Sequence, residues 1–428
     1  MNRLFCFFLV ILFMLIHDGF AQKLTEKKVA RLFAASELMK EHFVGFILQE
    51  ESGKIIYSQN ADVHFVPASN TKILTLYAAL HIIRDSIPAF QYEFSGDSLI
   101  IWGTGDPSFL HPKLNNGKAY DFLKRAAHNL YLAQQPDLKF EPSYWRSDPG
   151  HFPIYANTMQ AKADLQGNLE ISPKIMGSFL KADSSMVTEK FDIFRSVSDH
   201  SLIYPSFLSI PADYDDKVPF PMDLEKSRFL LEDTLKKEVK LINRLKKGDI
   251  KTFYSILADS LYQHMMLPSD NFLAEQVLIL CSAVLSDTLD PKKAIQYVEE
   301  NLFEGIKHKP VWEDGSGLSR YNLITPRTVL EILNRVEVLI GDQERLREMF
   351  PAGGLSGTLK NTYELDGGKA FVWAKTGTLR NMHLQSGWID TRKGRTYRFV
   401  FMNNNFVKPT PEIRNEMVRI MTTIHEQY

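Results

Sequence analysis

The stretch Pro67-Ala68-Ser69-Asn70-Thr71-Lys72, followed by an apolar run over residues 73–83, constrains the fold of this chain more than any other feature. Within and after this run, apolar residues recur at helical spacing: Leu74, Tyr77, Ala78 and Leu80. Neither Gly nor Pro interrupts the pattern until Pro88, so the spacing predicts a helix. Because the run is apolar nearly all round, we expect this helix to be buried in a core.

Ser69 and Lys72 stand three residues apart at the start of this helix. Positions i and i+3 share a helix face, so the Lys72 amine is expected to reach the Ser69 hydroxyl. The pair would then be a nucleophile beside a base. The pattern Ser-x-x-Lys occurs by chance about twice in a chain of this length, so its meaning depends on other motifs.

The composition is that of a large globular protein. The chain has 428 residues, of which 44% are hydrophobic, which predicts a large core and two or more domains. Its 50 basic and 51 acidic residues give a formal charge of -1. This balance provides no general attraction to nucleic acid or to an anionic membrane, so no nucleic-acid partner is predicted.

The N-terminus has the pattern of a secretory signal peptide. Arg3 precedes an uncharged, apolar segment over residues 4–16, and the small residues Gly19 and Ala21 fit cleavage after Ala21. The apolar segment is short for a membrane-spanning helix. We therefore predict a signal peptide over 1–21 and export to the periplasm or another extracytoplasmic site, with an uncleaved anchor as the alternative.

Neither a disulfide nor a metal site is predicted. After cleavage only Cys281 would remain, inside an apolar run over 277–285, where a buried packing thiol is expected. The twelve histidines form no His-Glu-x-x-His pattern and no Cys/His cluster. No metal and no cofactor is expected.

The first 250 residues change character at residue 85. Before it, we predict a helix over 22–40 and two strands over 42–49 and 54–58. From 85 to 250, prolines punctuate short alternating segments and helical periodicity is mostly absent. This region, which includes a predicted hairpin over 91–102, is interpreted as an inserted β-rich subdomain.

Helical patterns resume after residue 250. Helices are predicted over 253–266, 272–285, 291–303, 326–338 and 343–349. Three strands of an antiparallel meander follow, predicted over 370–376, 383–389 and 397–402. The last helix, 411–427, has a narrow apolar stripe and mixed charges, which favours packing against the terminal sheet over binding to a membrane.

Two further motifs follow the first one in a fixed order. Ser269-Asp270-Asn271 falls on a predicted loop between helices, and Lys375-Thr376-Gly377 falls at the end of a predicted strand. With the Ser-x-x-Lys pair, they form the trio that is typical of class A β-lactamases and penicillin-binding proteins. The trio indicates serine acyl transfer.

Each residue of the trio suits one part of that chemistry. Ser69 is the candidate nucleophile, and Lys72 the base if burial or a nearby positive charge, such as Lys375, lowers its pKa. The Ser269 hydroxyl would relay a proton to the leaving amine, and the Asn271 amide would orient Lys72 and the substrate.

Substrate binding is assigned to the third motif. Lys375 and Thr376 would hold a substrate carboxylate, and Gly377 and Thr378 continue the same strand. The backbone N–H groups of Ser69 and Thr378 would stabilise the tetrahedral oxyanion.

With these motifs, the chain resembles the D-Ala-D-Ala carboxypeptidase/endopeptidases of serine peptidase family S13, the class C low-molecular-mass penicillin-binding proteins. Four further segments also resemble segments of that family: 103–107, 314–320, 354–359 and 375–379. The glycines of the second and third of these segments equally suit turns.

The resemblance implies an α+β fold of the β-lactamase/transpeptidase type, in which a five-stranded antiparallel sheet is joined to a helical lobe. The catalytic domain would comprise 22–84 and 251–428, with 85–250 inserted between the first two motifs. Lys72 of the first motif and Ser269 of the second are 197 residues apart, which fits such an insertion.

The implied activity is hydrolysis of the terminal D-Ala-D-Ala bond of peptidoglycan stem peptides, and of D-amino-acid cross-links, through an acyl-enzyme on Ser69. Covalent inhibition by β-lactams and at most a loose membrane association are expected. One alternative is a β-lactamase, although no Glu-x-x-x-Asn pattern stands between the last two motifs. The other is a non-catalytic cell-envelope binding protein of the same fold. The sequence leaves open the balance of carboxypeptidase and endopeptidase activity and the oligomeric state.

Overall fold

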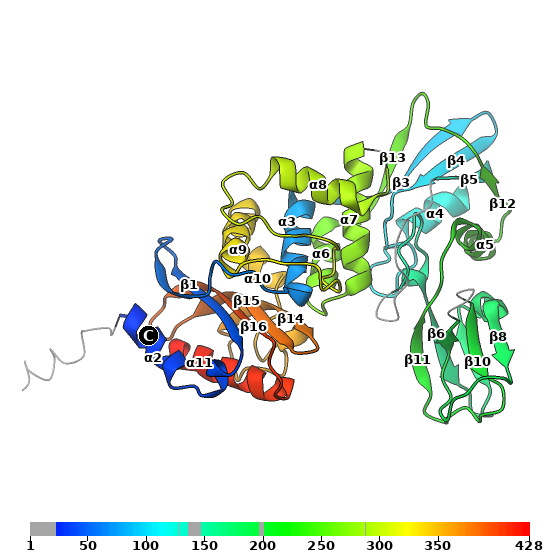
Figure 1. Cartoon of the computed structure of the whole chain (residues 1–428). Coiled ribbons are helices and arrows are strands. Elements are labelled where there is room, and N and C mark those ends of the chain that lie inside the picture. The colour runs from blue at the N-terminus through cyan, green and yellow to red at the C-terminus, as the bar shows by residue number, and fades with distance from the viewer. Residues whose placement is uncertain (1–22, 127, 136–146, 197–200, 287) are drawn as a thin grey trace, which may run out of the picture. The chain divides into compact units, whose positions relative to one another are not determined.

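A computed structural model describes residues 23–126, 128–135, 147–196, 201–286 and 288–428 of the chain (Figure 1). The predicted signal peptide lies outside the described residues. The chain forms two compact units: one comprises residues 1–73, 305–312 and 318–428, and the other comprises 74–304 and 313–317.

The first unit is built on a five-stranded antiparallel sheet in the order β14-β15-β16-β1-β2. Its strands are β1 (Phe43–Glu50), β2 (Ile55–Gln59), β14 (Val372–Leu379), β15 (Met382–Asp390) and β16 (Thr396–Asn404). The two predicted N-terminal strands and the predicted C-terminal meander are therefore both confirmed. They meet through the pairing of β1 with β16, so the two ends of the chain build one sheet.

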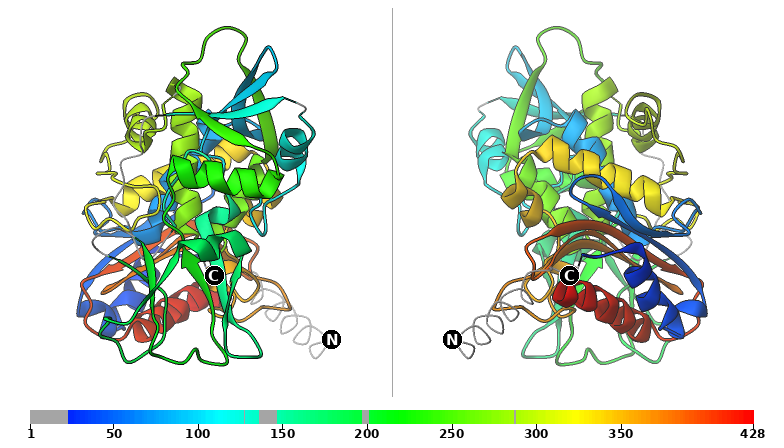
Figure 2. Two further views of the ribbon diagram at one scale, coloured as in Figure 1. Left: turned by 90° about the vertical axis from the view of Figure 1, so that its right-hand side faces the viewer. Right: turned by 90° about the vertical axis from the view of Figure 1, so that its left-hand side faces the viewer.

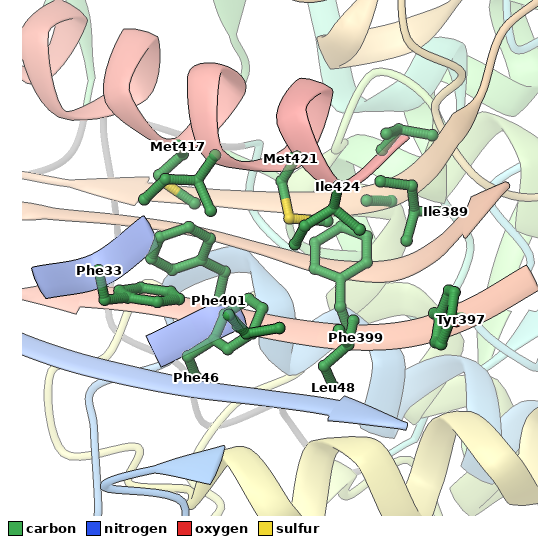
Figure 3. Packing of buried hydrophobic residues seen from close by; sticks show 14 of the residues in the cluster. Phe33, Phe46, Leu48, Ile389, Tyr397, Phe399, Phe401, Met417, Met421 and Ile424 are labelled. Carbon is green, nitrogen blue, oxygen red and sulfur yellow. The ribbon is translucent and has the colours of Figure 1, made fainter. Parts of the chain in front are cut away.

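One face of this sheet packs against the terminal helices α2 (Glu26–Ala34) and α11 (Thr410–Gln427), as Figure 2 shows from two sides. Side chains that alternate along the strands, such as Phe46 and Leu48, point into this layer, as period two requires. They meet the apolar stripe of α11, which carries Met417, Met421 and Ile424 (Figure 3). The predicted packing of the last helix against the sheet is confirmed.

The opposite face is covered by α9 (Pro326–Ile340), which is followed by α10 (Gln343–Glu348). The Thr325 hydroxyl caps α9 by accepting from Thr328 N, and Pro326 occupies its first turn. Gly45 of β1 permits the close approach, because a Cβ there would lie 2.8 Å from Pro326 Cγ and 2.7 Å from the Phe65 ring.

The second unit contains the remaining helices of the predicted helical lobe. They are α3 (Lys72–Ile82), whose first two residues belong to the first unit, α6 (Ala258–Met266), α7 (Asn271–Ser286) and α8 (Pro291–Asn301). In the described part of the chain, no single helix is long and apolar enough to cross a membrane; the bent pair of α7 and α8 reaches that length and composition together. Residues 271–282 of α7 are buried except for Asn271 itself.

The rest of the second unit is rich in strands, as expected. A mixed five-stranded sheet has the order β12-β5-β4-β3-β13, and two three-stranded sheets have the orders β11-β6-β7 and β8-β10-β9. Their strands are β3 (Ser86–Ser95), β4 (Ser98–Gly103), β5 (Asn129–Ala133), β6 (Thr158–Ala163), β7 (Leu169–Ser172), β8 (Leu180–Asp183), β9 (Phe194–Arg195), β10 (Leu202–Pro205), β11 (Asp215–Pro219), β12 (Val239–Ile242) and β13 (Lys251–Leu257). The predicted hairpin is confirmed as β3 and β4.

Several predicted elements differ from the structure. The helix predicted over 22–40 ends at Ala34, because the Ser36 hydroxyl accepts from Met39 N and begins a separate 3₁₀ turn, η1 (Leu38–Lys40). The first part of the helix predicted over 253–266 is strand β13.

Strand pairing explains this second difference. Strand β13 pairs with β3, and Phe253 stacks on Phe90 with their ring centroids 5.1 Å apart. Two helices in the region 85–250 were not predicted, namely α4 (Lys118–Arg125) and α5 (Leu224–Leu235), the second of which is capped by the Asp223 carboxylate. The division into a catalytic domain and an insertion at 85–250 stays a prediction.

Candidate active site

Ser69 lies in a 3₁₀ turn, η2 (Ala68–Thr71), that leads directly into α3. The residue before it, Ala68, has φ of 45°, a left-handed conformation that costs energy for any residue with a Cβ. Two hydrogen bonds hold it there: Thr71 Oγ1 donates to Ala68 O at 2.9 Å, and Asn70 N donates to Pro67 O at 3.0 Å. The turn thus holds Ser69 in a fixed position at the helix N-terminus.

The structure brings Ser69 and Lys72 together. Lys72 Nζ lies 3.0 Å from Ser69 Oγ, within hydrogen-bond distance, while Ser69 is only partly buried and Lys72 is fully buried. The spacing of three residues at the start of the helix therefore gives the predicted contact. A hydroxyl that a reagent can reach therefore lies beside an amine that is withdrawn from water.

Strand β14 lies against this turn. A Cβ on Gly377 would lie 2.8 Å from Pro67 O and 3.1 Å from Ser69 N, so only glycine fits without displacing the turn. On the neighbouring strand, Ser386 Oγ accepts a hydrogen bond of 2.7 Å from Asn70 Nδ2, and Asn70 is buried. The motif Lys375-Thr376-Gly377 is thus in contact with the Ser69 turn, and it lies inside the strand rather than at its end.

Lys375 is fully buried, and its ammonium donates to Thr376 O at 2.8 Å. Burial, and to a smaller extent the charge of Lys72, lowers the pKa of Lys375 well below its ordinary value. From the sequence, Lys375 is expected to be a source of positive charge that lowers the pKa of Lys72. In the structure burial disfavours the charged form of Lys375 itself, and the charge of Lys72 adds to this effect.

The hydroxyls of two threonines on β14 have partners that were not predicted from the sequence. Thr376 Oγ1 donates to Thr358 Oγ1 at 2.7 Å, and Thr378 Oγ1 lies 2.8 Å from Nδ1 of His383 on β15. Thr358 belongs to one of the segments that resemble the family, which was the only signal for it. Nothing in the sequence pointed to His383, because its position opposite Thr378 depends on the strand register.

The second motif lies in the second unit, between α6 and α7. Ser269 has φ of 63°, and Asp270 caps α7 by accepting from Leu273 N at 2.9 Å. Asn271 is the first residue of α7, as the predicted loop between helices requires. The roles of Ser269 and Asn271 toward Ser69 and Lys72 stay predictions.

One turn further along α7, Glu275 binds the loop 313–317 of the same unit. Its carboxylate accepts from Gly315 N and Ser316 N, both at 3.1 Å, and from Ser316 Oγ at 2.6 Å. The carbonyl of Gly315 accepts from Thr75 Oγ1 at 2.7 Å. This loop, part of a segment that resembles the family, thus joins α7 to α3 below their first turns.

A metal centre is not found among the described ranges of the chain, where no group of three or more His, Cys, Asp or Glu side chains is placed to hold an ion. In general, serine acyl transfer needs a nucleophile, a base and oxyanion donors, which hydroxyl, amine and backbone N–H groups can supply.

Comparison with known sequences supplies the family. Residues 25–123 and 255–424 match the D-Ala-D-Ala carboxypeptidase 3 (S13) family. The chain belongs to this family. The unmatched stretch, 124–254, falls mostly within the predicted insertion.

Two curated relatives of this S13 chain are informative. The D-alanyl-D-alanine carboxypeptidase DacB of Haemophilus influenzae is 25% identical over 436 residues, which cover 85% of both proteins. Penicillin-sensitive carboxypeptidase A of Dictyostelium discoideum is 27% identical over 190 residues, which cover 41% of this chain and 36% of the relative.

Solved structures confirm the fold. Penicillin-binding protein 4 (dacB) of H. influenzae matches with a TM-score of 0.68 at 20% identity, and the match covers 93% of this chain and 99% of that protein. A predatory peptidoglycan endopeptidase from Bdellovibrio bacteriovorus matches with a TM-score of 0.51 at 14% identity, over 89% and 92% of the two chains. The predicted α+β fold of the transpeptidase type is therefore correct. As an S13 member, the chain is a serine-type D-Ala-D-Ala carboxypeptidase.

Proposed function

We propose that this S13 chain hydrolyses the terminal D-Ala-D-Ala bond of peptidoglycan stem peptides through an acyl-enzyme on Ser69. The observation that carries the proposal is the distance of 3.0 Å between Ser69 Oγ and the buried Lys72 amine, at the turn that Gly377 approaches. This arrangement provides a nucleophile, a base and backbone N–H donors within one unit.

In the acylation step, the neutral Lys72 amine takes the proton of Ser69 as Oγ attacks the carbonyl carbon of the penultimate D-Ala. The new C–O bond converts the carbonyl oxygen into an oxyanion, which the N–H groups of Ser69 and Thr378 stabilise. Repulsion between the buried ammonium groups of Lys72 and Lys375 favours a state in which one of them has lost its proton.

The tetrahedral adduct then loses its leaving group. The C–N bond breaks, and the amine of the terminal D-Ala takes a proton, for which Ser269 is the proposed relay. Water hydrolyses the Ser69 ester and releases the shortened stem peptide. Asn271 is the proposed orienting group for Lys72 and the substrate amide.

The third motif is the proposed site for the C-terminal carboxylate of the substrate. The ammonium of Lys375, where it is protonated, and the hydroxyls of Thr376 and Thr378 are donors of the kind that bind carboxylates. In the structure the Thr376 hydroxyl donates its one proton to Thr358 Oγ1, so substrate binding would exchange this hydrogen bond for one to the carboxylate.

Labelling by a fluorescent penicillin tests the acyl-enzyme. Ser69→Ala should abolish covalent labelling and D-alanine release while leaving the melting temperature near that of the wild type, because Ser69 is only partly buried. Covalent labelling that persists in this variant would refute the assignment of Ser69. Fast turnover of nitrocefin instead of one stoichiometric burst would favour a β-lactamase, and binding of muropeptides without release of D-alanine would favour a non-catalytic binder.

The finer aspects of function are proposals of the same kind. Inhibition by β-lactams is supported by the H. influenzae protein, whose structure was also determined with a β-lactam. Cleavage of cross-links is supported only by the likeness to the Bdellovibrio protein, which is a peptidoglycan endopeptidase. Separation of the muropeptides after digestion of intact peptidoglycan would measure both activities.

An extracytoplasmic location is proposed because the substrate is part of the cell wall. The predicted signal peptide supports it. N-terminal sequencing of the mature protein should find Gln22 as the first residue, and an intact Met1 would contradict cleavage.

A further inference from the structure

The side chain of Thr378 lies at the open edge of the sheet beside the third motif. Strand β14 is the edge strand, and Thr378 is exposed. The backbone N–H of Ala374 points away from β15 and donates to Pro351 O. Because N–H directions alternate along a strand, every second residue counted from Ala374 directs its N–H to this edge of β14, the edge not paired with β15. Thr378 is one of these residues, and its hydroxyl is therefore placed beside its proposed oxyanion-binding N–H.

His383 is the cross-strand partner of Thr378. The two residues are directly opposite in the antiparallel pair, so their side chains lie on the same face of the sheet. His383 Nδ1 lies 2.8 Å from Thr378 Oγ1, and only 5% of His383 is exposed. The backbone of His383 is also held, since its carbonyl accepts from Asn403 Nδ2 at 3.3 Å.

The second ring nitrogen of His383 decides the direction of this hydrogen bond. Nε2 is buried, and no hydrogen-bonding atom in the described part of the chain reaches it. A buried N–H without an acceptor is rarer in proteins, and costs more, than a buried lone pair without a donor. The favoured tautomer therefore carries its proton on Nδ1, which donates to Thr378 Oγ1.

The charge of the ring agrees with this arrangement. Burial, with a smaller contribution from the positive charge of Arg414, lowers the pKa of His383 to about 4. At neutral pH the imidazole is therefore neutral and carries one proton. A neutral ring with its proton on Nδ1 fills one lone pair of the Thr378 hydroxyl and leaves the hydroxyl proton to another acceptor.

We propose that His383 is a positioning residue that orients the Thr378 hydroxyl so that its proton points to the carboxylate of the substrate. His383 does not touch the substrate and acts only through Thr378. A hydroxyl that could rotate would meet the carboxylate with its lone pairs part of the time, whereas the oriented hydroxyl always offers its proton. The inference rests on the proposed function, because it concerns the same carboxylate site.

The test uses two acyl-D-alanyl thioesters that differ only in the leaving group. Thioglycolate carries a carboxylate, and thioglycolamide does not. In His383→Leu, which fills the space but cannot donate, kcat/KM for the thioglycolate ester should fall about tenfold, the effect of one hydrogen bond to a charged group. The thioglycolamide ester should react at the wild-type rate, a selectivity that a general structural defect would not produce.

Two further variants are the controls. His383→Asn keeps an N–H donor one bond beyond Cγ, as imidazole Nδ1 does, and should restore most of the lost kcat/KM. Thr378→Val removes the hydroxyl, and in that background His383→Leu should have no further effect on the thioglycolate ester. Equal losses for both esters, or additive losses in the double variant, would overturn the inference.

The tautomer is measured independently of activity. Long-range ¹⁵N–¹H correlation spectra of the full-length protein, compared with those of His383→Leu, should show a protonated Nδ1 and an unprotonated Nε2 for His383. An active wild-type protein with the proton on Nε2 would overturn the inference alone. A wild-type protein that turns over neither thioester would overturn the proposed function, and the inference with it.

Discussion

Replacement of Gly377 by alanine probes the contact between strand β14 and the Ser69 turn. The added Cβ would lie 2.8 Å from Pro67 O and 3.1 Å from the backbone nitrogens of Ser69 and Asn70. Ordinary van der Waals contact would require the strand and the turn to separate by roughly 0.5 Å, and these neighbours are backbone atoms that cannot rotate away. The alanine backbone itself is unstrained, because φ of Gly377 is not positive.

The displacement falls on Ser69, the proposed nucleophile. Since a misplacement of about 1 Å can cost about a hundredfold in rate, the second-order rate constant of acylation by a fluorescent penicillin should fall about tenfold or more. Gly177→Ala is the matched control, because its Cβ would meet only Ile171 at 3.6 Å or more. Gly377→Ala that remains folded and acylates at the wild-type rate would refute the close approach of strand and turn.

Two further predictions concern stability. Burial raises the pKa of Asp106 to about 6 from an ordinary value of 3.8, so its contribution to stability should fall by about 3 kcal/mol as pH rises from about 4 to about 6. Asp106→Asn should remove that pH dependence from urea unfolding curves, and an unchanged dependence would contradict it. Burial alone would raise the pKa of Glu337. Its carboxylate accepts hydrogen bonds from Arg398 and from Trp388 Nε1, however, and these contacts lower the pKa below the ordinary value of 4.5. The stability that the contacts provide should therefore be lost as pH falls below about 4.5. Glu337→Gln should lower the free energy of unfolding at pH 7 by about 3 kcal/mol, because Arg398 keeps a largely buried charge, and a loss below about 1 kcal/mol would contradict this reasoning.

The sequence predicted those parts of the fold that local patterns determine. The helix after Ser69 and the hairpin turn at Gly96-Asp97 follow from spacing and turn residues over a few positions. The contact between Ser69 and Lys72 belongs to the same class, because one helical turn brings it about. Strand β13 was missed because its apolar residues, such as Phe253, fit a helix equally well, and only pairing with β3 decides between them.

The parts of the site that were missed depend on distant segments. Thr358 reaches Thr376 across 18 positions of sequence, and Asn70 reaches Ser386 across 316. Threonine, asparagine and serine are all common residues, so none of these positions is distinctive in the sequence. The lowered pKa of Lys375 could not be predicted for a related reason, since its sequence neighbours do not reveal that the whole side chain is buried.

The register of β14 places the two sets of proposed site groups on alternate residues. Lys375 and Gly377 face the Ser69 turn, while Thr376 and Thr378 direct their N–H groups to the open edge of the sheet. A slip of one residue would exchange the two sets, and both proposed functions should then be lost. The hairpin turn to β15 pins this register, because Asn381 adopts φ of 68° there and its amide donates to Phe406 O at 2.7 Å. The proposed catalytic arrangement at Ser69 therefore depends on a turn that has no proposed part in the chemistry.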